Sequence, residues 1–154
     1  MLIILAVVAA SGCRPATTDR ACGPITREQL DPAYLVHVIR EDTDVVYSTD
    51  PPTSGPHQPG PPISGVVTAP LPPALQVGVL ERGDILLQHA PDLSAQQRSR
   101  LEALAGSNVV VAPNPDLPSP VVATAWTYKL RCASVDVDAL HRFIDQRAGK
   151  GPEG

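Results

Sequence analysis

Proline is the residue that most limits what this chain can fold into. The sequence has 18 prolines in 154 residues, and nine of them lie in residues 50–73. Proline costs about 3 kcal/mol inside a helix and cannot donate to the ladder of a central strand, so this segment is predicted to be a loop. A disordered linker would have the same composition. An ordered loop is favoured, because the stretch Thr53-Ser54-Gly55-Pro56-His57 is too specific for a spacer.

The rest of the chain predicts one α+β domain with a small, mainly antiparallel sheet, two main helices and long proline-rich loops. Helices are predicted over residues 95–105, after Ser94 as N-cap, and after Asp136, where apolar residues recur at helical spacing. A capping-box pattern over residues 26–29 predicts a further short helix. Runs rich in β-branched and apolar residues predict strands over 35–39, 45–47, 77–80, 85–88, 109–111 and 121–130. The strands 77–80 and 85–88 are expected to form a hairpin, with Gly83 at a positive φ.

Length and charge exclude several classes of function. A chain of 154 residues has room for one core of useful size. The formal net charge of −4 argues against binding to a phosphate backbone, and one Trp, one Phe and three Tyr leave few platforms for stacking bases. No nucleic-acid partner is therefore expected. The chain also lacks the glycine-rich nucleotide loops, the GxSxG nucleophile motif, and the CxxC and HExxH motifs.

Residues 1–12 are predicted to be a signal peptide of the lipoprotein type. The first ten residues are apolar throughout, which is too short for a membrane-spanning helix but typical of the apolar region of a signal peptide. Ala10-Ser11-Gly12-Cys13 resembles the lipobox of bacterial lipoproteins, in which small residues precede an acylated cysteine. This resemblance implies lipid on Cys13, a tether over 13–24 and a globular domain over 25–154, anchored to the cell membrane at its extracytoplasmic face. The alternative is a buried N-terminal strand or helix with an ordinary cysteine.

The other two cysteines are expected to form a disulfide. With Cys13 acylated, Cys22 and Cys132 remain, which is an even number for an oxidising compartment. A bridge between them would close a loop of about 110 residues, worth roughly 4–5 kcal/mol in the chain-entropy model. Two free buried thiols would instead fit a cytosolic protein. Export and the disulfide are therefore predicted together.

Four histidines are the candidates for chemistry. His57 follows Pro56, which restrains its backbone, so its imidazole is suited to a ligand or metal site; the alternative is that it only holds the loop together. His37 alternates with valines in a β-rich run and faces either solvent or a site. His89 is expected to be exposed at a strand end, and His141 to lie near the apolar face of the last helix. Glu81 is a turn carboxylate, with Arg82 or a backbone amide as its ordinary partner.

Several stretches together resemble the bacterial family called domain of unknown function 3105. The main motif consists of Pro51, Pro52, Thr53, Ser54, Gly55, Pro56 and His57. Further matches follow in order at Leu80-Glu81 with Gly83, Val111-Ala112-Pro113, Ala123-Thr124-Ala125-Trp126, Phe143-Ile144 and Gly151-Pro152-Glu153. The resemblance covers about residues 34–153 and implies an exported or membrane-anchored protein without an established activity.

The chain departs from this family at two positions. The family typically reads His-x-Leu-Glu-His-Gly, and those histidines look like metal ligands together with the one at position 57. This chain has Gly78 and Arg82 instead. Three nitrogen or sulfur ligands are usual for a catalytic transition metal, and a guanidinium repels a cation.

The first expectation is therefore a non-catalytic, lipid-anchored envelope protein that binds a partner or small ligand around His57 and Glu81. The second is a protein that binds copper or zinc through His57 and His37, with His89 or Glu81 as a further ligand. The third is an envelope hydrolase with His57 as general base and Glu81 as its partner. No cofactor is predicted apart from the transition metal of the second alternative.

Overall fold

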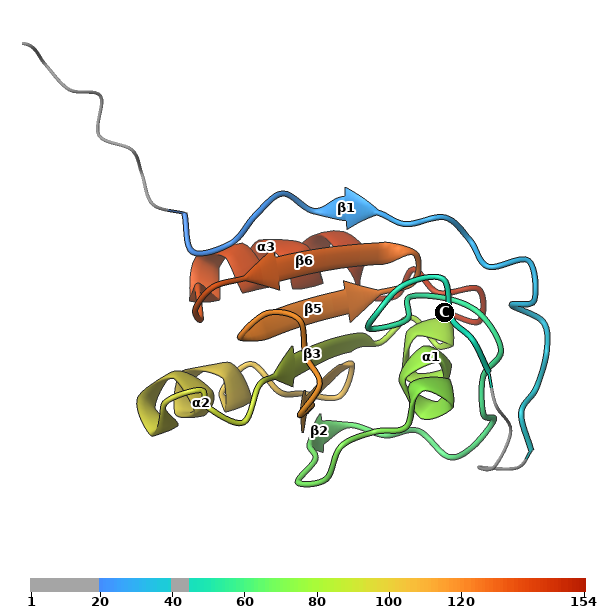
Figure 1. The fold of residues 1–154 in the computed structure, drawn as a ribbon, viewed down its shortest axis with the longest axis horizontal. Coiled ribbons are helices and arrows are strands. Elements are labelled where there is room, and N and C mark those ends of the chain that lie inside the picture. Colours follow the sequence, from blue (N-terminus) through green and yellow to red (C-terminus); the bar gives the residue numbers. More distant parts are fainter. Residues whose placement is uncertain (1–19, 40–44) are drawn as a thin grey trace, which may run out of the picture.

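The computed structural model describes residues 20–39 and 45–154. The expected signal peptide, Cys13 and most of the tether lie outside these residues. Within them the chain forms six strands and three helices, so the predicted α+β class is confirmed (Figure 1). In chain order the elements are β1 (Thr26–Arg27), β2 (Gly65–Val66), α1 (Pro73–Glu81), β3 (Ile85–His89), α2 (Ala95–Glu102), β4 (Val109–Pro113), β5 (Val121–Ala125), β6 (Tyr128–Cys132) and α3 (Val137–Arg147).

One mixed sheet organises the fold. Its strand order is β1-β6-β5-β3-β4-β2. The pairs β1–β6, β6–β5 and β5–β3 are antiparallel, whereas β3–β4 and β4–β2 are parallel. Helix α2 connects the parallel strands β3 and β4, so these three elements make one β-α-β unit. Both strands are almost entirely buried, β4 is apolar throughout and β3 is apolar over its first three residues, as expected where both faces of a sheet are covered.

Side chains of the sheet alternate between two cores. Ile85 and Leu87 of β3 pack on the face covered by α2 and α3, where Phe143 is fully buried. Leu86 points the other way and packs with Leu80 of α1. Full burial of each such side chain contributes about 1.5–3 kcal/mol. The sheet is thus packed on both faces, and the two-residue strands β1 and β2 form its edges.

The predicted helices after Ser94 and Asp136 are confirmed as α2 and α3. The Ser94 hydroxyl accepts a hydrogen bond from the Gln97 amide, and the Asp136 carboxylate accepts one from the Ala139 amide. The strands over 85–88 and 109–111 are confirmed as β3 and β4. These elements have a strong apolar pattern, a capping residue, or both.

The expected hairpin at 77–80 and 85–88 is wrong, because residues 77–80 lie inside α1. Pro73 occupies the first helical turn, where the missing amide hydrogen costs nothing. Residues 76–80 are all buried, so this part of α1 has no exposed face and its sequence has no helical periodicity to detect. Gly83 does have a positive φ of 83°, but it ends a helix rather than turning a hairpin.

Three other predictions of secondary structure are wrong. Thr26–Arg27 forms β1, where the Thr26 hydroxyl donates to the Lys129 carbonyl (3.2 Å) instead of capping a helix. Residues 121–130 form β5 and most of β6, with Thr127 at φ 58° in the turn between them. Residues 35–39 and 45–47 form no regular strand, and apart from buried Val38 most of their apolar side chains are exposed: Ile39 is 86% and Val46 is 92% exposed.

The predicted disulfide between Cys22 and Cys132 is present. It joins the segment before β1 to the last residue of β6, across a sequence separation of 110. Backbone hydrogen bonds flank it, from Gly23 to the Arg131 carbonyl (3.0 Å) and from Ala133 to the Ala21 carbonyl (2.7 Å). Among the residues described, no helix has the length and apolar character needed to cross a membrane.

Candidate functional site

The proline-rich loop is ordered where it carries the family motif. Thr53 and Ser54 are only 2% and 3% exposed. The Ser54 hydroxyl accepts from the Asp31 amide (2.9 Å), and the Thr53 carbonyl accepts from the Thr127 amide (3.0 Å). Gly55 has φ 129°, and a Cβ there would lie 3.2 Å from the Tyr47 ring. The loop is therefore fixed from several sides, and so is the residue that ends the motif.

His57 is held in one orientation by its backbone and its ring. Its amide donates to the Val36 carbonyl (3.0 Å), and its carbonyl accepts from the Val38 amide (2.7 Å). The ring is 1% exposed, and Nδ1 lies 3.2 Å from the Gly55 carbonyl oxygen. A carbonyl can only accept, so Nδ1 carries a hydrogen. The other ring nitrogen, Nε2, faces Glu81.

The contact between His57 and Glu81 is the central feature of the site. Nε2 of His57 lies 2.7 Å from Oε2 of Glu81, although the two groups are not aligned as a linear hydrogen bond. Because Nδ1 already carries a hydrogen, this short contact requires a second proton on either Nε2 or the carboxyl group. The pair is thus an imidazolium with a carboxylate, or a neutral imidazole with a carboxylic acid. Both forms have no net charge.

Glu81 is the more accessible member of the pair. Its side chain is 13% exposed. Burial raises the pKa of Glu81 above its ordinary value; the charge of His57 opposes this rise, and the nearby carboxylate of Glu153 adds to it. A carboxyl group with a raised pKa can exchange a proton closer to neutral pH than an ordinary surface glutamate.

The C-terminal segment closes around Glu81. The Glu153 amide donates to the Glu81 carbonyl (3.1 Å), and the Gly149 amide donates to the Gly83 carbonyl (2.8 Å). A Cβ on Gly151 would collide with the Glu81 carbonyl oxygen, so only glycine fits there. In Figure 1 the C-terminus lies beside the end of α1. The end of α1 is thus fixed by segments before and after it in the sequence.

His37 lies on the outer side of His57. Their ring centroids are 4.8 Å apart with an interplanar angle of 77°, and the two residues form an isolated parallel bridge. His37 is exposed, whereas His57 is not. The structure therefore brings together three of the four predicted candidates, His37, His57 and Glu81. Arg82 is adjacent, but its Nε faces Asp84 (3.6 Å), so the partner of Glu81 is His57 and not Arg82.

The other two histidines lie elsewhere. His89 is at the carboxyl end of β3, whereas Glu81 precedes its amino end. The expectation that His89 is exposed is wrong, because it is 7% exposed. His141 was expected near the apolar face of the last helix, but it is exposed on α3.

The space around position 78 explains why this chain has glycine there, where the family typically has histidine. A Cβ on Gly78 would lie 2.7 Å from the Gln58 carbonyl oxygen. Helix α1 therefore packs directly on the backbone that follows His57, and an imidazole at position 78 has no space here. Within residues 20–39 and 45–154, no group of three or more His, Cys, Asp or Glu residues is arranged to hold a metal ion.

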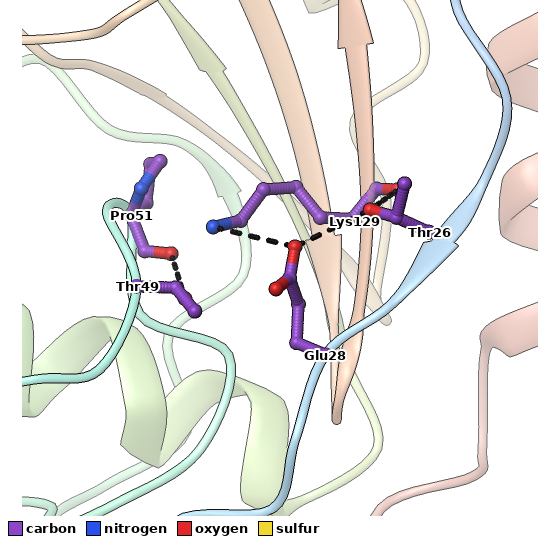
Figure 2. A network of polar contacts seen from close by, with 5 residues as sticks. All are labelled: Thr26, Glu28, Thr49, Pro51 and Lys129. Carbon is purple, nitrogen blue, oxygen red and sulfur yellow. Dashed lines mark hydrogen bonds and ion pairs between the residues drawn. The ribbon is translucent and has the colours of Figure 1, made fainter.

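Lys129 is a buried charge that sequence reasoning missed. It is 0% exposed, and Figure 2 shows its side chain extending from β6 toward the loop at Thr49 and Pro51. Its Nζ lies 3.9 Å from Oε1 of Glu28. Burial lowers the pKa of Lys129 to about 8, against the attraction of Glu28. In the sequence Lys129 stands between Tyr128 and Leu130, and only the strand register shows that it points inward.

A comparison with protein families gives one match. The model described as Protein of unknown function (DUF3105) matches residues 37–154. This range includes His37, His57 and Glu81 and every element except β1. No curated protein and no solved structure matches the chain.

Proposed function

Because this chain belongs to the DUF3105 family, whose function is unknown, we propose a function from the site itself. The protein is a lipid-anchored binding module of the extracytoplasmic face, in which Glu81 and His37 meet the ligand. His57 is a positioning residue that holds the Glu81 carboxyl group. The 2.7 Å contact between buried His57 and partly exposed Glu81 carries this proposal.

Such a pair is poorly explained by stability alone. Replacing a buried ionic pair by apolar residues of similar size is often neutral or stabilising, because taking charges out of water is costly. A partly exposed carboxyl group whose pKa is raised by burial, here at the end of helix α1 and against a rigid loop, is typical of functional sites. The rigid support from the loop and from the C-terminal segment keeps Glu81 in place before any ligand arrives.

Binding is favoured over covalent catalysis by the state of the serine hydroxyl in the proline-rich motif. Ser54 is 3% exposed, and its Oγ already accepts from the Asp31 amide. It is therefore part of the loop framework and is not presented to a substrate. The ligand-facing groups that remain, Glu81 and His37, are a carboxyl group and an imidazole that bind by hydrogen bonds and charge.

Fragment screening by NMR tests the site. Spectra of the ¹⁵N-labelled domain are recorded with a library of small polar fragments, for the wild type, Glu81→Gln and Asp145→Asn. Asp145 is an exposed carboxylate on α3 and serves as the control. We expect hits whose shifts centre on His37 and Glu81, which are lost in Glu81→Gln and kept in Asp145→Asn. Hits that centre elsewhere, or that persist in Glu81→Gln, would contradict the proposal.

The proposed location rests on the N-terminal pattern and on chemistry. The Cys22–Cys132 disulfide favours an oxidising compartment, and Cys13 stands in a lipobox-like stretch. Processing of the full chain should be blocked by globomycin and abolished in Cys13→Ala. Unchanged processing in either experiment would refute the anchor while leaving the binding site untouched.

Binding of copper or zinc is a second candidate, favoured by one observation. The rings of His37 and His57 are adjacent, and the Glu81 carboxyl group contacts Nε2 of His57. Metal analysis of protein purified without chelator or histidine tag, with His57→Ala as the comparison, decides the matter. If both forms carry no metal, this candidate is eliminated.

A further inference from the structure

A polar cavity lies at the end of β3 opposite to Glu81. Its volume is about 250 Å³, and α2, the segment after β2 and the last residues of the parallel strands β3 and β4 line it. In open sheets with parallel strands, ligands are commonly bound outside the carboxyl ends of those strands. Sites for drug-sized molecules measure roughly 300–1,000 Å³, so this cavity suits a smaller molecule.

His89 lines this cavity, and one of its ring nitrogens is already engaged by the backbone. It is 7% exposed, and its Nδ1 lies 3.0 Å from the Ala90 carbonyl oxygen. Because that oxygen can only accept, Nδ1 carries a hydrogen and Nε2 is the nitrogen left for another partner. A buried imidazole usually has partners for both nitrogens, so the second position is suited to a ligand.

Arg98 and Glu102 place opposite charges on one wall of the cavity. They are four residues apart on α2 and therefore lie on the same face of the helix. The Arg98 Nη2 donates to the Leu93 carbonyl (3.3 Å), which restrains the guanidinium, while its Nε is buried without a hydrogen-bond partner. Among the ion pairs of the described residues, none involves Arg98 or Glu102. Both charges are therefore available to a ligand.

We propose that this cavity binds a small zwitterion of the α-amino acid class. The carboxylate of the ligand lies on Arg98, and its ammonium group lies between Glu102 and Nε2 of His89. An aliphatic side chain of the ligand packs on the apolar wall, which consists of Val66, Val67 and Pro113. A simple anion would be repelled by Glu102 and a simple cation by Arg98, whereas a zwitterion satisfies both. This site is independent of the one at Glu81.

Titration with L-valine, followed by NMR, tests the proposal. We expect shifts at Thr68, His89 and Arg98, and an affinity that falls about tenfold or more in Arg98→Gln and in Glu102→Gln. The control is Arg100→Gln, since Arg100 is an exposed arginine of the same helix and does not line the cavity. In that variant the affinity should stay unchanged.

Two analogues of the probe separate a zwitterion site from a simple ion site. Isovalerate lacks the ammonium group of valine, and isobutylamine lacks its carboxylate; both should bind the wild type more weakly than L-valine. Isovalerate binding as tightly as L-valine, or tighter binding in Glu102→Gln, would show an anion site and overturn the proposal. The absence of shifts at the cavity with millimolar L-valine would also overturn it. The analogue comparison uses only the wild type, so it holds even if a variant fails to fold.

Discussion

The contact between His57 and Glu81 joins a proline loop to the end of a helix, and each side chain depends on the other for its protonation state. Both residues are candidates from the sequence, but only the hydrolase alternative pairs them, because residues 24 apart in sequence carry no distance information. Lys129 was missed for a related reason. A lysine inside a strand pattern is ordinarily exposed, and only the pairing of β6 with β1 and the overlying loop bury it.

Glu81→Gln should change how stability depends on pH. The pKa of Glu81 is raised by burial in the folded protein above its ordinary value of 4.5. As pH rises from 4.5 through the raised pKa, the folded state holds a proton that the unfolded state has lost, so this carboxyl group makes the wild type less stable. The variant should lack that decline. Urea unfolding at several pH values measures it, and parallel pH curves for both proteins would contradict the assignment.

Lys129→Met should stabilise the protein at neutral pH. The pKa of Lys129 is lowered from 10.5 to about 8 in the folded state, so wild-type stability should rise as pH increases from 8 to 10.5. Methionine removes the cost of burying the ammonium group, and we expect a gain of roughly 1–3 kcal/mol at pH 7. Lys150→Met, at an exposed position, is the control. A loss of stability in Lys129→Met alone would show that the ion pair with Glu28 outweighs desolvation.

At the scale of elements, a helix or strand is predicted correctly where its own sequence contains a cap or a dense apolar run. The helices α2 and α3 have N-caps, and the strands β3 and β4 have dense β-branched or aliphatic runs, so their sequences predict them. The sequence of α1 reads as a strand because all of Val77–Leu80 is buried. β1 and β2 have two residues each, which is too short for any pattern. Their existence depends on neighbouring strands, which is tertiary information.

The turn between β5 and β6 was missed because its sequence contains no glycine, proline or asparagine. Thr127 has φ 58°, a conformation that is unfavourable for a β-branched residue by about 1–2 kcal/mol. Thr127→Asn should therefore raise the free energy of unfolding by about 0.5–1 kcal/mol, since asparagine tolerates this region better. Urea denaturation measures the change, with Thr68→Asn as the control. A gain of equal size in both variants would mean that φ is not the cause.

At the scale of the whole molecule, the disulfide links the start of the domain to β6, the strand next to one edge of the sheet. Cys22 and Cys132 are 110 residues apart, and Cys132 ends a strand in the interior of the strand order. The closed segment contains His37, His57, Glu81, and the cavity at His89. Both proposed sites therefore belong to one covalently closed unit.

Removing the bridge should destabilise the domain strongly. We expect Cys22→Ala with Cys132→Ala to lower the free energy of unfolding by about 2–5 kcal/mol, because the unfolded chain gains freedom. Wild type treated with a reductant should lose a similar amount. Equal stability of the oxidised wild type and the double variant would indicate that the bond does not form, and non-reducing mass spectrometry would then find both thiols free.

The closure of the C-terminal segment around Glu81 has a practical consequence for anyone who prepares this protein. Gly154 donates to the Gly151 carbonyl, and a Cβ at position 154 would lie 3.1 Å from the Arg82 carbonyl oxygen. An affinity tag fused after Gly154 would therefore begin against the wall of the candidate site. A histidine tag there would also add imidazoles near Glu81. Purification handles belong on the other end of the domain, ahead of Arg20, where Ala21 keeps its hydrogen bond to Ala133.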